Sequence, residues 1–255
     1  MRYALKFAYY GKGFHGFARQ PNMLTVEGEI IRVLKDNNII ASAKDAVFRS
    51  ASRTDKGVSA FGNVVAFNAV KKMNADDLGG LNRSLKNIYF YGIKEVDDGF
   101  YPRFARMRWY RYYMNGRNVD KNKFLRAAVL FTGTHDFSNF ARVEIHRNPV
   151  RRIENIVVEW FEDNIVAVNF YAQSFLWQQV RRIVAAMEKV GRGVLDERMV
   201  EDALMHPEKK VDFGVANAEL LVLVDVLYGF EFEVNEKVFG CLKEIERRIV
   251  ESLSG

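Results

Sequence analysis

The sequence predicts an α+β protein with two ferredoxin-like domains, whose antiparallel sheets lie side by side around a central cleft. Three observations support this fold. The chain has 255 residues, of which 49% are hydrophobic, so it can bury a large core without disulfides. Apolar residues alternate with period two in some segments and follow helical spacing in others. The expected elements then follow the order β-α-β-β-α-β in each half, which indicates domains at residues 1–101 and 102–255.

In the first half, the alternation of residues 2–10 predicts a half-buried strand. Thr25 is a suitable N-cap for a helix at 26–37, because its hydroxyl can accept a hydrogen bond from the first helical turn. Asn74 is expected to cap a second helix. The strands expected in this half are residues 46–52, 63–70 and 88–96.

The second half repeats this order without repeating the sequence. The expected strands are residues 106–114, a hairpin of 153–161 and 165–171, and the apolar run 219–228. The expected helices are residues 121–133, closed by Gly133, then 174–190, 196–205 and 234–253. In the helix 174–190, the spacing places Arg181 at the edge of the apolar stripe beside Trp177. Arg182 is expected to point nearly opposite, toward solvent.

Composition excludes several classes of protein. A single cysteine, Cys241, rules out a disulfide framework and fits a reducing compartment. The four histidines lack the spacing of metal ligands, so we predict no metal and no cofactor. The N-terminus lacks the apolar core of a signal peptide, and no stretch reaches the roughly 20 apolar residues of a membrane span. We therefore expect a cytoplasmic protein that does not enter a membrane.

The charge of the chain indicates a polyanionic partner. The net charge is +6 and the pI about 9.3. Arginines alternate with aromatic residues between 103 and 113, and a second basic group lies between 142 and 152. Guanidinium groups pair with phosphate and bases stack on aromatic rings, so this mixture favours RNA. The predicted domains are then RRM-like, with an RNA-binding cleft.

Two glycine-containing segments need interpretation. Residues 53–57, Arg-Thr-Asp-Lys-Gly, have the composition of an ordinary charged turn between two strands. Residues 11–16, GKGFHG, match the spacing of a dinucleotide-binding loop, but Pro21 and the order of elements argue against a helix opening there. We interpret residues 11–16 as a flexible glycine loop.

Five segments in the same order resemble the TruA family of tRNA pseudouridine synthases. SRTDKGVSA (52–60) resembles the family signature around its catalytic aspartate. The other four are YYGKGFHGFARQ (9–20), RFARMRWYRYYM (103–114), GTHDFSNF (133–140) and SFLWQQVRRIVAAMEKVGRG (174–193). The form RTDKGVSA is nearer to the archaeal and eukaryotic branch than to the bacterial one.

The resemblance implies an enzyme that isomerises uridine to pseudouridine in the anticodon stem-loop of tRNA, at positions 38, 39 or 40, without a cofactor. It implies three catalytic residues: Asp55 as the nucleophile, Tyr110 stacked on the uracil, and Arg181 as the cation that keeps the carboxylate charged. It implies an RNA contact for Arg53 in the space that the flipped nucleotide leaves. The residues expected to bind RNA are Arg53, Lys56, Arg106, Arg108, Arg19 and Gln20.

The resemblance also implies a homodimer that binds tRNA. Two alternatives remain at this stage. One is an enzyme of the same fold that modifies a different uridine. The other is a non-catalytic RNA-binding protein built on paired ferredoxin-like domains, although such a protein has no need of a lone acid facing RNA.

Overall fold

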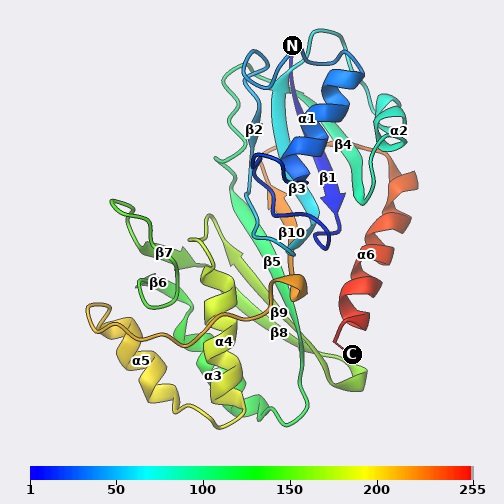
Figure 1. Ribbon diagram of the computed structural model, residues 1–255. Coiled ribbons are helices and arrows are strands. Elements are labelled where there is room, and N and C mark those ends of the chain that lie inside the picture. Colours follow the sequence, from blue (N-terminus) through cyan, green and yellow to red (C-terminus); the bar gives the residue numbers. More distant parts are fainter. Residues whose placement is uncertain (254–255) are drawn as a thin grey trace. The chain divides into compact units, whose positions relative to one another are not determined.

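The computed structural model describes residues 1–253 and is a mixed α/β structure with mostly antiparallel sheets (Figure 1). The chain divides into two compact units. Unit 1 contains Met1–Arg106 and Val222–Ser252, and the main part of unit 2 is Met107–Leu221. The segment from Val222 therefore groups with the first half of the chain, whereas the sequence assigned it to the second. A compact unit is not in itself an independently folding domain, so the division at residue 101 stays a prediction.

Unit 1 is built on one sheet with the strand order β11-β4-β1-β3-β10, and β2 also pairs with β3. Only β10 runs parallel to its neighbour β3, and its register begins with Val222 opposite Ser59. The strand pairs β1–β3, β1–β4, β4–β11 and β2–β3 of this sheet are antiparallel. The strands are β1 (Arg2–Tyr9), β2 (Arg49–Ser50), β3 (Ser59–Asn68), β4 (Ile88–Val96), β10 (Leu221–Leu227) and β11 (Glu233–Val234).

Two strand predictions in unit 1 need correction. The strand expected at 46–52 is reduced to Arg49–Ser50, because turns occupy the residues before it and Val47 has a φ of 46°. The strand expected at 63–70 begins four residues earlier, at Ser59. This earlier start brings the strand directly after the Asp55 loop. The expected strand at 88–96 is confirmed in full.

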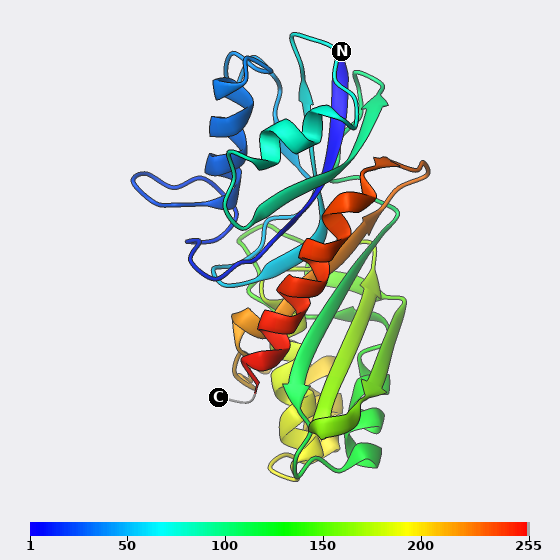
Figure 2. The ribbon, with the colours of Figure 1, turned by 90° about the vertical axis from the view of Figure 1, so that its right-hand side faces the viewer.

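Three helices belong to unit 1: α1 (Val26–Asp36), α2 (Asp77–Asn82) and α6 (Phe239–Glu251). Helix α1 lies against one face of the sheet (Figures 1 and 2). Thr25 caps it as expected, since its hydroxyl accepts a hydrogen bond from the Gly28 N–H at 3.3 Å. Helix α6 begins later than expected, and its Arg248 guanidinium lies over the Tyr10 ring at 5.6 Å.

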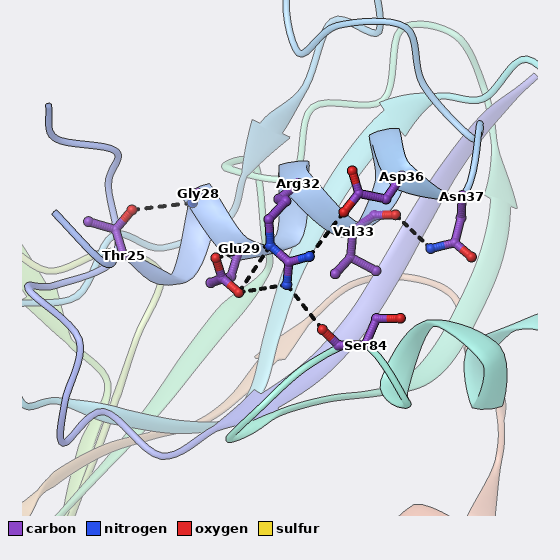
Figure 3. A network of polar contacts seen from close by, with 8 residues as sticks. All are labelled: Thr25, Gly28, Glu29, Arg32, Val33, Asp36, Asn37 and Ser84. Atoms are coloured by element: carbon purple, nitrogen blue, oxygen red, sulfur yellow. Dashed lines mark hydrogen bonds and ion pairs between the residues drawn. The ribbon is translucent and has the colours of Figure 1, made fainter. Parts of the chain in front are cut away.

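The exposed side of α1 carries a polar network centred on Arg32 (Figure 3). Its guanidinium pairs with Glu29 at 2.8 Å and with Asp36 at 3.0 Å. It also donates to the Ser84 carbonyl at 3.0 Å, which ties α1 to the segment after α2. The hydrogen bonds that the Arg32 guanidinium donates to the Glu29 carboxylate raise the pKa of Arg32.

The apolar side of α1 closes an aromatic core. Phe7, on β1, contacts the rings of Phe17 and Phe90 with centroids 6.4 Å and 5.7 Å away. Tyr9 lies beside Phe17 at 6.2 Å, and none of these four side chains is exposed. Phe17 is therefore fixed inside unit 1 although it comes from the loop after β1.

The opposite face of the unit 1 sheet carries a charged pair. The Lys6 ammonium lies 2.6 Å from the Asp225 carboxylate, and both side chains are largely buried. Two glycines make room for them, because a Cβ at Gly62 would lie 2.8 Å from Asp225 and one at Gly92 would lie 3.0 Å from Lys6. Burial raises the pKa of Asp225, and this effect outweighs the opposing attraction of Lys6.

Unit 2 contains a sheet of three antiparallel strands in the order β5-β9-β8, and a separate pair, β6 and β7. Helices α3 and α4 lie side by side on one face of the larger sheet (Figure 2). The strands are β5 (Met107–Asn115), β6 (Gly133–Asp136), β7 (Val150–Ile153), β8 (Asn155–Trp160) and β9 (Ile165–Ala172). The helices are α3 (Lys121–Leu130), α4 (Gln179–Gly191) and α5 (Glu197–Met205). Short 3₁₀ turns occupy Glu162–Asn164 and Ala218–Leu220, and Glu236–Val238 forms another in unit 1.

Two helix predictions in unit 2 need correction. Helix α3 ends at Leu130, so Gly133 does not close it. With a φ of 103°, Gly133 instead starts β6. Helix α4 begins at Gln179, five residues later than expected, because Gln178 takes a left-handed conformation with a φ of 62°. Trp177 is therefore outside the helix.

Among the residues that the structure describes, no helix is long and apolar enough to cross a membrane.

Candidate active site

Asp55 lies in unit 1 on the loop between β2 and β3, and main-chain hydrogen bonds hold this loop. The carbonyl of Asp55 accepts a bond from the Val58 N–H at 3.2 Å. The carbonyl of Thr54 accepts one from the Phe17 N–H at 3.1 Å, and the Thr54 hydroxyl shares a 2.7 Å bond with the hydroxyl of Tyr9. Because Phe17 and Tyr9 are core residues, these bonds connect the loop directly to the core of unit 1.

The glycine segment 11–16 packs against the same loop. The Gly11 N–H donates to the Ser59 hydroxyl at 2.9 Å. A Cβ at Gly11 would lie 2.2 Å from the carbonyl oxygen of Val58, and one at Gly16 would lie 3.4 Å from the Lys56 nitrogen. At Gly11 only glycine permits such a close approach of two main chains, and Gly16 has a φ of 94°, which favours glycine. The segment 11–16 is a loop, as the sequence predicts, and it packs against the Asp55 loop.

The side chains of the loop are more exposed than its main chain. Arg53 and Lys56 are exposed and Asp55 is half-buried, whereas Gly57 and Val58 are buried. Arg53 also lines an open cavity of about 480 Å³, together with Arg19 and Gln20. The other residues around this cavity are Ala18, Pro21 and Glu27. Three of the six residues expected to bind RNA thus surround one cavity.

Glu27 lines this cavity and contacts Arg19. Its carboxylate accepts a hydrogen bond from the Arg19 N–H at 3.0 Å and lies 3.7 Å from the Arg19 guanidinium. The Gln20 amide donates to the His15 carbonyl at 2.7 Å. The segment that carries Arg19 and Gln20 is therefore tied to the start of α1 and to the glycine segment.

Tyr110 lies in unit 2, on β5 opposite Phe170 of β9. Its side chain is 9% exposed, and its ring meets the ring of Phe175 edge-on, with centroids 5.3 Å apart. Arg108 and Tyr112 are buried on the same side of the strand, as their spacing predicts. Burial raises the pKa of the Tyr112 hydroxyl.

The two arginines expected to contact RNA from residues 106–108 have different surroundings. Arg106 is exposed and belongs to unit 1, where its guanidinium lies close to Gly229. Arg108 belongs to unit 2, is 7% exposed, and donates to the Gln173 carbonyl. Arg108 therefore supports the main chain after β9.

A turn of residues 174–178 connects β9 to α4. The Gln179 side chain, 1% exposed, accepts a hydrogen bond from the Leu176 N–H at 2.8 Å. The Trp177 carbonyl accepts one from the Arg142 N–H at 2.8 Å. The turn is thus fixed by bonds on two successive residues before the helix begins.

Arg181 follows in the first turn of α4. Its Nε donates to the Ala216 carbonyl at 2.8 Å, and its own carbonyl accepts a bond from the Ala216 N–H at 3.1 Å. Arg182 does not point to solvent as expected. Its side chain is 15% exposed and its guanidinium lies 2.9 Å from the Asp212 carboxylate.

The sequence predicts Asp55, Tyr110 and Arg181 as catalytic residues but does not predict the residues that support their segments. Gly11, Phe175 and Gln179 hold the Asp55 loop or the turn before α4, and none was singled out. The spacing of glycines after β1 was a usable signal for Gly11. No group of three or more His, Cys, Asp or Glu side chains that could hold a metal occurs within residues 1–253.

Comparison with known proteins defines the class. A family model described as tRNA pseudouridine synthase matches residues 127–229. A protein of Thermococcus sibiricus described as tRNA pseudouridine synthase A is 44% identical, over 98% of this chain and 93% of that protein. Proteins with the same description from Pyrococcus furiosus and Methanothermobacter thermautotrophicus are 43% and 35% identical, each over 98% of this chain and 92% of the relative.

The chain therefore belongs to the tRNA pseudouridine synthase A family and is an isomerase. The family resemblance inferred from the five sequence segments is confirmed, and these relatives are archaeal. Among solved structures, a chain of a Cbf5-Nop10-Gar1 complex matches with a TM-score of 0.37 and 14% identity, over 73% of this chain and 45% of that one. This likeness is too distant to bear on function.

Proposed function

We propose that this enzyme isomerises uridine to pseudouridine at positions 38, 39 or 40 of the tRNA anticodon stem-loop, with Asp55 as the nucleophile. Family membership supports the reaction and the tRNA substrate. The structure of the loop around Asp55 is the observation that supports its role as the nucleophile. A half-buried carboxylate stands between exposed Arg53 and Lys56 on a main chain that core residues hold.

The reaction needs one nucleophile and one proton transfer. The bond between N1 of uracil and C1′ of the ribose breaks, and a bond forms between C5 and C1′. Asp55 attacks C1′ or C6 and is released at the end, C5 loses its proton, and N1 gains one. Covalent catalysis of this kind divides a difficult step into two easier ones.

Tyr110 and Arg181 have supporting roles in this proposal. A buried tyrosine ring can stack on the uracil, and its hydroxyl is suited to receive or relay the C5 proton. Arg181 supplies positive charge that favours the ionised carboxylate. Its bonds with Ala216 limit the rotamers that its guanidinium can adopt.

The remaining residues are proposed to bind RNA. Arg53 occupies the gap that the flipped nucleotide leaves, and Arg19 and Gln20 contact the RNA beside it, since all three line one cavity. Lys56 and Arg106 are exposed and suited to phosphate. Arg108 is the weakest of the six assignments, because it is buried and already bonded to Gln173.

The proposal includes two ferredoxin-like domains with a central RNA-binding cleft, a homodimer, action in the cytoplasm and no cofactor. The order of strands β4-β1-β3-β2 in unit 1 supports the first domain, because a split βαβ arrangement has this order. A non-catalytic RNA-binding protein remains the alternative to Asp55 chemistry, and a different uridine remains the alternative to positions 38–40.

The first test is tritium release from tRNA transcripts labelled at C5 of uridine, with mapping of the modified positions. Asp55→Asn should reduce release by at least about 1,000-fold and change the Kd for tRNA by no more than a few-fold. Asp45→Asn, at an exposed position of the same unit, is the matched control and should behave as wild type. Substantial turnover by Asp55→Asn would exclude it as the nucleophile, and modification elsewhere would exclude the anticodon positions.

A second test separates the two neighbouring arginines. Arg181→Ala should lower kcat strongly with little effect on tRNA binding, and Arg181→Lys should recover part of the activity because it retains the charge. Arg182→Ala breaks the pair with Asp212 and should affect stability more than kcat. An essential Arg182 together with a dispensable Arg181 would overturn the assignment.

A further inference from the structure

Trp177 is held by its main chain while much of its side chain is exposed. The side chain is 49% exposed, which is unusual for so large an apolar group. The preceding residue is bonded to Gln179, the carbonyl of Trp177 is bonded to Arg142, and Gln178 is left-handed. The indole is therefore presented from a fixed turn.

A cation covers this ring. The guanidinium of Arg142 lies 4.8 Å from the centre of the Trp177 ring, and the two residues also form an isolated antiparallel bridge. An indole with a guanidinium over it combines a stacking surface with a phosphate-binding group. Proteins use this combination to hold single-stranded nucleic acid.

The segment that begins with Arg142 is basic. Residues 142–154 contain four arginines and two glutamates, and they therefore carry a net charge of +2. Arg147 and Arg152 pair with those glutamates at the surface. The Arg142 side chain is exposed, so its charge is available to a polyanion next to the indole.

The same turn reaches the proposed uracil-binding residue. Phe175, two residues before Trp177, packs edge-on against Tyr110. Arg181 follows Trp177 within the first turn of α4. A base that stacks on Trp177 would thus be held by the turn that supports Tyr110.

We propose that Trp177 and Arg142 form a binding site for one unpaired nucleobase of the tRNA, adjacent to the uridine that is modified. The base stacks on the indole, and the guanidinium of Arg142 contacts the phosphate of the same nucleotide. This inference rests on the proposed function, and it identifies Trp177 as a substrate-positioning residue.

The test combines affinity, turnover and fluorescence. Trp177→Ala should raise the Kd for tRNA by about 10- to 100-fold, the range expected for loss of one stacked base. Its kcat at saturating tRNA should stay within about twofold of wild type, and Trp177→Phe should recover much of the affinity because the ring can still stack. The salt dependence of binding should not change for Trp177→Ala, but its slope should fall for Arg142→Ala.

Fluorescence keeps the test independent of folding defects. Addition of tRNA should quench the tryptophan emission of the wild type, and Trp177→Phe should remove most of the quenching. Trp160→Phe is the matched control, because Trp160 of unit 2 also has a cation, Lys121, over its ring at 4.9 Å. That variant should retain the quenching.

Two outcomes would overturn the inference: quenching that persists in Trp177→Phe, or a Kd of Trp177→Ala equal to that of the wild type. Failure of the proposed function looks different. If Asp55→Asn remains active, or the anticodon arm is unmodified, while Trp177 is still quenched by tRNA, only the proposed function fails.

Discussion

The Asp55 loop of unit 1 and the turn at 174–178 of unit 2 are held in opposite ways. The loop depends on missing side chains, because Gly11 allows another main chain to approach it and Gly16 takes a φ of 94°. The turn depends on side chains that are present, because the Gln179 amide and the Phe175 ring hold it in place. Substitutions that add side-chain atoms should therefore disturb the loop, and substitutions that remove side-chain atoms should disturb the turn.

The largest effect on activity in this comparison is expected from a side chain added in unit 1. Gly11→Ala places a Cβ 2.2 Å from the Val58 carbonyl oxygen, so the Asp55 loop has to move. A displacement of this size should lower tritium release about 100-fold and cost about 1–3 kcal/mol of unfolding free energy. Gly99→Ala is the control, because its Cβ would meet nothing within 4 Å. Near-normal activity of Gly11→Ala would show that the loop adapts.

A substitution that removes a charged group from unit 1 tests whether this unit as a whole, unlike the Asp55 loop, depends on side-chain contacts. Lys6→Met leaves the Asp225 carboxylate without its cation under partial burial, and should cost about 2–4 kcal/mol of unfolding free energy. Arg126→Ala, which breaks a surface pair with Glu197, should cost less than about 1 kcal/mol. Urea unfolding measures both. Equal costs would mean that the Lys6–Asp225 pair behaves as a surface pair.

The matching substitution in unit 2, which removes a side-chain amide, is Gln179→Ala. It removes the acceptor for the buried Leu176 N–H, and should cost about 1–3 kcal/mol in thermal or urea unfolding. It should also raise KM for tRNA, since the turn carries Trp177. Gln173→Ala changes an exposed side chain of the same connection and should stay within about 0.5 kcal/mol. A silent Gln179→Ala would remove the contrast between the loop and the turn.

The smallest effects concern two aspartates with opposite pKa shifts. Burial raises the pKa of Asp225, so its contribution to stability is greatest below its ordinary value of 3.8 and declines as pH rises through the raised pKa. A hydrogen bond from the Gly214 N–H, and then Arg182, lower the pKa of Asp212. Its contribution is present above 3.8 and is lost as pH falls through the lowered pKa.

Unfolding between about pH 3 and 7 should therefore show opposite changes of slope in Asp225→Asn and Asp212→Asn. The change for Asp212 should be slight and sensitive to salt, because its side chain is 71% exposed. Slopes of the same sign would contradict the assignment of burial as the dominant cause at Asp225.

Local signals were sufficient where a segment is determined by its own residues. Helix α1 begins after Thr25, and β4 spans residues 88–96, as predicted. The loop with Asp55 was also identifiable, because its residues match a family signature. These features need little information from distant parts of the chain.

Predictions failed where a distant residue decides the structure. Helix α4 begins late because the Gln179 side chain and Arg142 hold a turn before it. Arg182 is removed from solvent by Asp212, which helical spacing alone cannot reveal. The RNA-binding role of the six candidate residues and the catalytic roles of Asp55, Tyr110 and Arg181 stay predictions, although three of the six candidates surround one cavity.

The parallel pairing of β10 with β3 has a consequence for how the protein is made. Ser59 and Ala60, directly after the Asp55 loop, pair with Val222 and Leu223, which are far away in the chain. A ribosome therefore synthesises the main part of unit 2 before unit 1 can complete its sheet. Pairings between such distant segments form slowly and delay folding. The start of β3, directly after the Asp55 loop, should gain its parallel partner only late in translation, so that a partly synthesised enzyme is expected to be inactive.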